Sequence, residues 1–196
     1  EDRVLRYNGA TGKFMDVFVS AGSGGLKDPS DLVFGPDGNL YVNSQFGKKQ
    51  VLRYDGDTGE FLDVFSSGVT MREPTNFTFG ADGHLYVSDW TKAALYTPDR
   101  VLRFDGETGE YLELFTRVHR PVGLRFGPDG LLYINSYDTC EVLTFDHMTG
   151  DFVGVVGSDG LDHPSHTVFD AQGNMYVASS YNHRVLRYSG NSDYYK

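Results

Sequence analysis

A tetrad of the form Val-Leu-Arg-Tyr recurs along the chain, and it constrains the fold more than any other feature. Full or close copies begin near Val4, Val51, Val101, Val142 and Val185. Successive copies start 41 to 50 residues apart. A period of this size is the signature of stacked copies of one supersecondary unit. We therefore predict a single repeat domain over residues 1–196, in which shared residues serve the scaffold and differing residues are free for function.

Each repeat has the pattern of four short strands separated by turns, as the second copy illustrates. Val51–Tyr54 is rich in β-branched and aromatic residues, and Phe61–Phe65 alternates apolar with polar residues, which are both strand patterns. Asn76–Phe79 and Leu85–Val87 follow as two more strands. Four short antiparallel strands per roughly 45 residues is the size of one β-propeller blade. The sequence predicts an all-β fold, a β-propeller of four-stranded antiparallel blades with about four and a quarter repeats.

The turns between these strands repeat as well. The form Gly-x-Asp-Gly occurs at Gly35–Gly38, Gly80–Gly83 and Gly127–Gly130. Turn chemistry explains these residues, because Gly tolerates positive φ and Asp bonds to its own turn. Asp55 and Asp57, in the other kind of turn, also have the spacing of oxygen ligands for calcium, but the full calcium-loop pattern is absent. The sequence therefore favours turn chemistry there.

Composition excludes several classes of protein. The net charge is −10, which opposes binding to phosphate backbones, so we do not expect a nucleic-acid partner. No stretch approaches the roughly 18 apolar residues of a membrane helix, so no transmembrane segment is expected. Cys140 is the only cysteine, which excludes an intrachain disulfide framework. The chain begins with Glu1 rather than Met, which is compatible with removal of a signal peptide or a larger flanking region, and we expect an extracellular or periplasmic location.

Two longer motifs surround the tetrad. One is Pro-x-x-Leu-x-Phe-Gly-Pro-Asp-Gly-Asn-Leu-Tyr-Val, at Pro29–Val42, and the other is Val-Leu-Arg-Tyr-Asp-Gly-x-Thr-Gly. Together they resemble bacterial NHL repeats. They are also similar to the wider six-bladed group of SMP-30/gluconolactonase-like proteins and to virginiamycin B lyase propellers. This resemblance covers essentially the whole chain, and it is specific for the fold rather than for an activity.

The resemblance implies an inner strand that lines the axis of each blade, followed by second, third and outer strands. The inner strands would be Asp31–Phe34, Asn76–Phe79, Gly123–Phe126 and His166–Phe169. The tetrads would be third strands, so the chain has five third strands and four of each other kind. Six blades would need about 270 residues. We therefore expect part of a larger six-bladed propeller, with an unusual four-bladed ring or completion by association of copies as alternatives.

One position of the inner strands differs in every copy. Alignment on the proline before each inner strand places Asp31, Asn76, Gly123 and His166 together, and these positions would ring the mouth of the channel. Asp31, Asn76 and His166 could bind a divalent cation, Ca2+ or Zn2+, in a grouping similar to the metal sites of SMP-30-like lactonases. The alternatives are contact with a polar ligand and a structural role, bonded to neighbouring loop backbone. Arg125, further along its strand, could meet an anion or pair with a carboxylate.

Loops predicted at the same mouth carry aromatic and histidine side chains. The loop from Ser88 to Arg100 is longer than its equivalents and carries Trp90 and Tyr96. We expect this aromatic pair to be exposed, a feature used for partner or sugar binding. The alternative is that the recurring aromatic side chain packs between blades. The candidate ligand-binding residues are Phe46, Trp90, Tyr96, Arg125, Tyr137, His163, Tyr181 and His183.

Three functions follow from this pattern. The first is a non-catalytic binding module that recognises a protein or a glycan through its loops. The second is a metal-dependent lactonase or lyase acting at the channel mouth, since general-base chemistry needs groups such as these histidines. The third is a self-assembling subunit, a homo-oligomer, because unpaired sheet edges favour association. No catalytic residue is assigned from the sequence.

Overall fold

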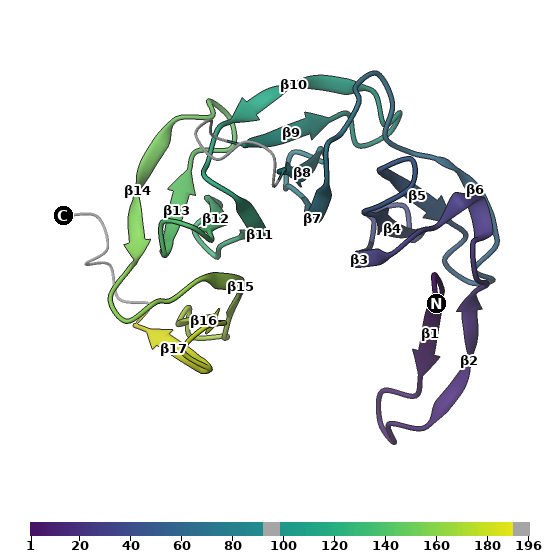
Figure 1. The fold of residues 1–196 in the computed structure, drawn as a ribbon, viewed down its shortest axis with the longest axis horizontal. Coiled ribbons are helices and arrows are strands. Elements are labelled where there is room, and N and C mark those ends of the chain that lie inside the picture. Colours follow the sequence, from purple (N-terminus) through teal and green to yellow (C-terminus); the bar gives the residue numbers. More distant parts are fainter. Residues whose placement is uncertain (92–98, 190–196) are drawn as a thin grey trace.

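A computed structural model describes residues 1–91 and 99–189. Within these residues, seventeen strands form five antiparallel sheets, and a single short 3-10 turn, η1 (Ser23–Gly25), is helical. The sheets stand side by side in an open arc, and each presents its first strand to the centre (Figure 1). The predicted all-β propeller architecture is confirmed. No helix of this part of the chain is long and apolar enough to cross a membrane.

Three of the sheets are complete blades that run from the inner to the outer strand in chain order. They are β3 (Pro29–Phe34), β4 (Leu40–Ser44), β5 (Gln50–Tyr54) and β6 (Phe61–Val64); β7 (Pro74–Phe79), β8 (Leu85–Asp89), β9 (Arg100–Phe104) and β10 (Tyr111–Thr116); and β11 (Pro121–Phe126), β12 (Leu132–Ser136), β13 (Glu141–Phe145) and β14 (Phe152–Gly157). The other two sheets are partial. They are β1 (Val4–Tyr7) with β2 (Phe14–Val19), and β15 (Pro164–Phe169), β16 (Met175–Ser179) and β17 (Arg184–Tyr188). The tetrads lie on third strands, which confirms the predicted strand count.

The tetrad arginine has a partner on the outer strand of its own blade. The facing pairs are Arg6–Asp16, Arg53–Asp63 and Arg103–Glu113. In the fourth copy Thr144 replaces the arginine, and its hydroxyl donates a hydrogen bond of 3.1 Å to the carbonyl of Gly154 on the facing strand. Arg187 of β17 is exposed, because its sheet has no outer strand in the described residues. The sequence interpretation of these arginines as scaffold is confirmed for the three acidic pairs.

The second strand of each blade carries a tyrosine that packs against the next blade. The ring contacts with the following inner strand are Tyr41–Phe79, Tyr86–Phe126 and Tyr133–Phe169. Tyr41 and Tyr86 also meet a phenylalanine at the end of the outer strand of their own blade, Phe65 and Phe115, and all five centroid distances are 4.8 to 5.4 Å. All are edge-to-face, an arrangement worth about 0.5–1.5 kcal/mol beyond the buried area. In each case the hydroxyl bonds to the aspartate of the Gly-x-Asp-Gly turn. One side chain therefore closes the turn and joins two blades.

The first residue of that turn must be glycine because the neighbouring tyrosine ring leaves no room for a Cβ atom, not because the backbone there has a positive φ. A Cβ added to Gly35 would lie 2.4 Å from the Tyr41 ring, and one added to Gly127 would lie 2.3 Å from the Tyr133 ring. Neither glycine has positive φ. The inter-blade tyrosine therefore dictates the residue six positions before it.

The turns after the tetrads use their aspartates internally. Asp55 Oδ1 accepts hydrogen bonds from the backbone N–H groups of Asp57 and Thr58, at 3.1 and 2.8 Å, and from the Thr58 hydroxyl. These bonds hold the pKa of Asp55 below its usual value, chiefly through the Thr58 N–H. Turn chemistry therefore accounts for this aspartate.

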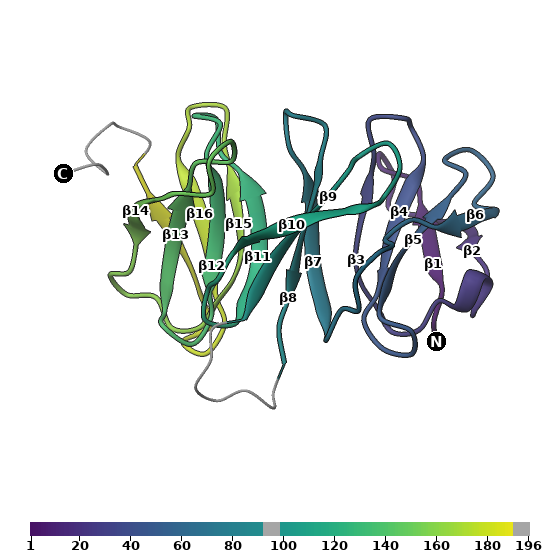
Figure 2. The same ribbon diagram turned by 90° about the horizontal axis from the view of Figure 1, so that it is seen from above.

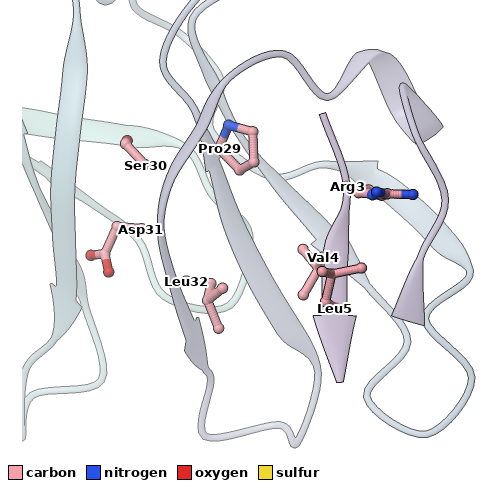
Figure 3. Close-up of a pocket in the computed structure, with 7 residues that line it drawn as sticks. All are labelled: Arg3, Val4, Leu5, Pro29, Ser30, Asp31 and Leu32. Carbon is pink, nitrogen blue, oxygen red and sulfur yellow. The ribbon is translucent and has the colours of Figure 1, made fainter. Parts of the chain in front are cut away.

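The two ends of the arc do not meet (Figure 1). The β1–β2 sheet has no inner or second strand, and the edge of β1 that a second strand would occupy is unpaired in the described structure. A pocket of about 310 Å³ lies between β1 and β3, where Figure 3 shows Leu5 and Leu32. Both side chains are exposed, as are Phe34 beside them and Val185 at the other end of the arc. Exposed apolar faces and unpaired edges of this kind favour association.

The tyrosine position allows a matched test of this geometry. Tyr86 packs between two blades, whereas Tyr176 bonds to Asp170, the first residue of its own turn, and no blade follows it in the described structure. We expect Tyr86→Ala to lower the free energy of unfolding by about 3–5 kcal/mol. Tyr176→Ala should cost much less, because less of its ring is buried. Urea denaturation of both variants measures the difference, and equal losses would show that another structure covers the end of the arc.

Candidate functional site

The loops that enter the inner strands meet the loops between second and third strands on one side of the molecule, at the same end of every blade. The N–H of Trp90 donates to the carbonyl of Glu73 at 3.4 Å, and the N–H of Tyr137 donates to the carbonyl of Arg120 at 3.1 Å. Ser180 makes the equivalent bond in the last sheet. We call this side the loop face. It is formed by the loops before β3, β7, β11 and β15 and by the loops after β4, β8, β12 and β16. It lies along the lower edge of Figure 2, where the N-terminus also lies.

On the inner strands, Asn76 joins three blades. Its Nδ2 donates to Asp31 Oδ2 on β3 at 2.7 Å, and its Oδ1 accepts from the N–H of Leu124 on β11 at 2.7 Å. Asp31 Oδ2 also accepts from the N–H of Phe77 at 3.1 Å. The Asn76 oxygen is thus committed to a backbone donor, so as placed the trio Asp31, Asn76 and His166 does not form a ready cation site. Its metal role stays a prediction.

Gly123 occupies the same position on β11 and makes room for the neighbouring blade. A Cβ there would lie 2.7 Å from the Ser165 carbonyl oxygen and 2.8 Å from Asn135 Oδ1. The latter oxygen accepts the hydroxyl hydrogen of Thr167 on β15 at 3.1 Å. The absence of a side chain is therefore explained by close packing between blades.

Asp31 experiences two opposing influences. Burial raises the pKa of its carboxyl above the usual value, and the N–H groups of Phe77 and Leu32 partly offset that rise. The charges of His166 and Arg125 also act to lower the pKa of Asp31. These two side chains are exposed on inner strands β15 and β11. Asp31, Arg125 and His166 thus lie on the inner strands of three different sheets and interact through their charges.

A row of stacked side chains crosses three blades on the loop face. The Arg120 guanidinium lies 4.4 Å from the Trp90 ring and 4.4 Å from the Tyr137 ring. The His163 ring follows, 4.6 Å from Tyr137 and 4.0 Å from Tyr181. Cation–π contacts of this kind are worth about 0.5–2 kcal/mol each. Arg120 thereby links Trp90 to Tyr137, and His163 links Tyr137 to Tyr181. The row thus joins four of the residues predicted from the sequence.

The members of this row differ in accessibility. Trp90 is only 7% exposed, and Arg120 of the next blade covers one face of it, which matches the alternative that the recurring aromatic side chain packs between blades. Tyr181 is 61% exposed and Phe46 is 42% exposed, so both can touch a partner. His183 is also exposed on this face. Tyr96 lies outside the described residues.

The base of the long loop is held by a buried ion pair. Asp89 is fully buried and accepts hydrogen bonds from the N–H groups of Arg72 and Glu73, at 2.6 and 3.0 Å, and from the Arg100 guanidinium. Asp99 bonds to the N–H of Thr91 at 3.1 Å, and burial raises the pKa of its carboxyl. The two ends of this loop are therefore fixed to the sheet.

Backbone strain is concentrated on the loop face. Seven non-glycine residues of the described chain have positive φ: Asp2, Asp28, Lys49, Arg120, Cys140, His163 and His183. They occupy two repeated positions, the residue before the inner-strand proline and the residue two before the third-strand valine. Such conformations cost of order 1–3 kcal/mol when occupied by bulky residues, and they gather at functional sites.

Sequence reasoning missed four residues of this face: Asp99, Arg120, Cys140 and Asp162. Arg120 and His163 each precede the repeated proline, where other copies carry Asp28 and Glu73. That variation could have marked the position. From the sequence, Cys140 served only to exclude an intrachain disulfide framework. Its contacts with the neighbouring blade do not follow from spacing within one repeat.

Comparison with known proteins gives the fold. No family model and no curated protein matches this chain. Among solved structures, a gluconolactonase from Xanthomonas campestris aligns over 96% of this chain and 66% of its own, with a TM-score of 0.74 and 18% identity. A chain of a nidogen/laminin complex aligns over 96% and 68%, with a TM-score of 0.75 and 14% identity. An auxiliary nutrient-binding protein from Bacteroides ovatus aligns over 84% and 39%, with a TM-score of 0.66 and 17% identity.

The fold is that of a β-propeller. The chain spans less than two thirds of the gluconolactonase that it matches. At these identities the likeness shows the fold alone, so activity and partners rest on the residues of the loop face.

The raised pKa of Asp31 predicts a pH dependence of stability. The unfolded carboxyl loses its proton near pH 3.9, before the folded one does, so stability falls as the pH rises from that value through the folded pKa. An asparagine can accept the same two hydrogen bonds without a charge. We therefore expect the stability of Asp31→Asn, relative to that of the original chain, to increase from about pH 3 to about pH 7.

Thermal denaturation across that pH range measures this gain. Asp57→Asn is the matched control, because Asp57 is exposed and its side chain takes no part in the channel. A growing loss of stability in Asp31→Asn toward pH 7 would contradict the prediction. It would mean that attraction to Arg125 and His166 outweighs burial.

Proposed function

We propose that this protein is a non-catalytic binding module that recognises a protein or a glycan through its loop face. The observation that carries the proposal is the stacked row from Trp90 to Tyr181. Arg120 and His163 hold its rings in place, so little conformational entropy is lost when a ligand packs against them. Aromatic and arginine side chains supply much of the energy at interfaces. Tyr181 and Phe46 offer accessible ring surface on different blades.

Two features of the structural neighbours support a binding role. Auxiliary nutrient-binding proteins from two Bacteroides species share the fold, and so does a chain of a nidogen/laminin complex. We further propose an extracellular or periplasmic location and the NHL-like character of the repeats. The single Cys140 is compatible with either side of a membrane.

A lactonase or lyase acting in the channel is the second candidate. The charge interaction of Asp31 with Arg125 and His166 favours it, since an acid, a base and an anion-binding cation lie on the inner strands of three different sheets. Gluconolactonases are among the structural neighbours. The bonding of Asn76 to Asp31 and Leu124 counts against a cation there.

Self-assembly is the third candidate, and the unpaired edges of β1 and β17 in the described structure favour it. A second copy docked at those edges would bury the exposed side chains of Leu5, Leu32 and Val185.

Binding through the loop face can be tested with an oligosaccharide array and a panel of extracellular proteins. We expect Tyr181→Ala to weaken binding of whichever probe is retained by at least about fivefold, as for an interface residue worth more than about 1 kcal/mol. Phe46→Ala should have a smaller effect. Met148→Ala is the control, because Met148 is similarly exposed but lies in the turn between β13 and β14, on the side of the molecule opposite the loop face. Unchanged binding by Tyr181→Ala would contradict recognition through this row.

An assay of lactone hydrolysis with and without added Ca2+ or Zn2+ distinguishes the enzyme, our second candidate, from the binding module. The binding proposal expects no turnover above that of Asp31→Asn, which removes the only carboxylate of the channel trio. Turnover that depends on Asp31 and on His166 would replace the binding proposal with the enzyme.

A further inference from the structure

Three side chains with different metal-ligating chemistry meet at the boundary between two blades. Ligand atoms of Cys140, Asp162 and His163 all lie within 4.8 Å of one another. In the described residues this is the one group of three or more histidine, cysteine or acidic side chains with that spacing. It lies on the loop face, away from the inner-strand position of Asp31 and His166.

Two loops supply these residues. Cys140 ends the loop between β12 and β13, and Asp162 and His163 come directly before β15. The N–H of His163 donates to Cys140 Sγ at 3.4 Å, which directly links the two loops. Cys140 and His163 both have positive φ, at 59° and 56°. Both loops therefore adopt unfavourable backbone conformations at the residues that face one another.

The imidazole is fixed in place from several sides. His163 Nδ1 lies 2.6 Å from Asp162 Oδ1. Its ring packs on Tyr137 and Tyr181, at 4.6 and 4.0 Å. These contacts limit the rotamers of His163 and hold a ring nitrogen near the thiol. A ligand set held in this way loses little entropy when an ion binds.

The shape of the cluster separates a metal site from a nucleophilic triad. In a Cys–His–Asp triad the three groups form a line, with the carboxylate and the thiol on opposite nitrogens of the imidazole. Here the carboxylate oxygen, the ring nitrogen and the sulfur form a closed triangle. A single ion can contact all three corners of a triangle, whereas a proton relay requires the line.

We propose that Cys140, Asp162 and His163 bind a zinc ion that joins the β11–β14 blade to the β15–β17 sheet. Thiolate, imidazole and carboxylate are the ligands that zinc takes in proteins, usually four in number. Three come from the chain, and the partial exposure of Asp162 and His163 leaves the fourth position open to water or a ligand atom. This site shares His163 with the stacked row. Zinc binding there does not require a ligand on the loop face, and Cys140 and Asp162 belong to neither the row nor the channel trio.

Cobalt substitution tests the proposal directly. Cys140 is the only cysteine, so a thiolate-to-cobalt charge-transfer band can come from no other residue. We expect the reduced full chain to bind one Co2+ with this band, and Zn2+ to displace it. Cys140→Ser should abolish the band. His163→Ala should weaken zinc affinity by more than about 100-fold, beyond the effect of about 10- to 100-fold that follows the loss of an outer-shell partner. His119→Ala, an exposed histidine on the same face, should bind zinc like the original chain.

Stability and reactivity give two further readouts. Zinc should raise the melting temperature of the original chain and of His119→Ala, but not of Cys140→Ser, because the ion binds only the folded state. Zinc should also protect Cys140 from alkylation by iodoacetamide. A missing charge-transfer band, unchanged zinc affinity in Cys140→Ser, or rapid alkylation that zinc does not slow would each overturn the proposal.

Discussion

Packing of one blade on the next is the interaction on which the rest of this structure depends. A single four-stranded sheet has two faces and cannot bury both by itself. Each complete blade covers part of its second face in the same way: a tyrosine ring packs edge-to-face on a phenylalanine of the following inner strand. These tyrosines are Tyr41, Tyr86 and Tyr133. The same residues hold the turns through their hydroxyl groups. Because one side chain does both, the turn sequence and the spacing between blades are coupled.

Where the repeats differ, the differing residues lie at the junctions between blades. Asn76 bonds to blades on both sides, and Gly123 leaves room for the approach of the next strand. On the loop face Arg120 lies between two aromatic rings that come from different blades. Variation between copies therefore creates different chemistry at each junction. The row of stacked rings and the Cys140 cluster are two results of that variation.

The strand count and the open ends agree with each other. In the described residues, five third strands against four of each other kind leave one sheet without an outer strand and another without an inner and a second strand. Arg187 shows the consequence at the level of one residue, since its counterparts Arg53 and Arg103 pair with an acidic residue on the strand that it lacks. Such unsatisfied edges explain why association is a candidate function of this chain alongside ligand binding.

Much of the architecture could be predicted from the sequence. The tetrads, the alternating strands and the Gly-x-Asp-Gly turns depend on local periodicity and turn chemistry, which a repeat displays several times over. The position shared by Asp31, Asn76 and His166 was also found by alignment of the copies. What the sequence could not decide is which side chains meet across blades, because those contacts join residues that are more than twenty positions apart. Only the tertiary structure commits the Asn76 oxygen to Leu124, buries Trp90 under Arg120 and brings Cys140 to His163. The physical reason is that local sequence sets each strand and turn, whereas the packing of neighbouring sheets sets the distances between their loops.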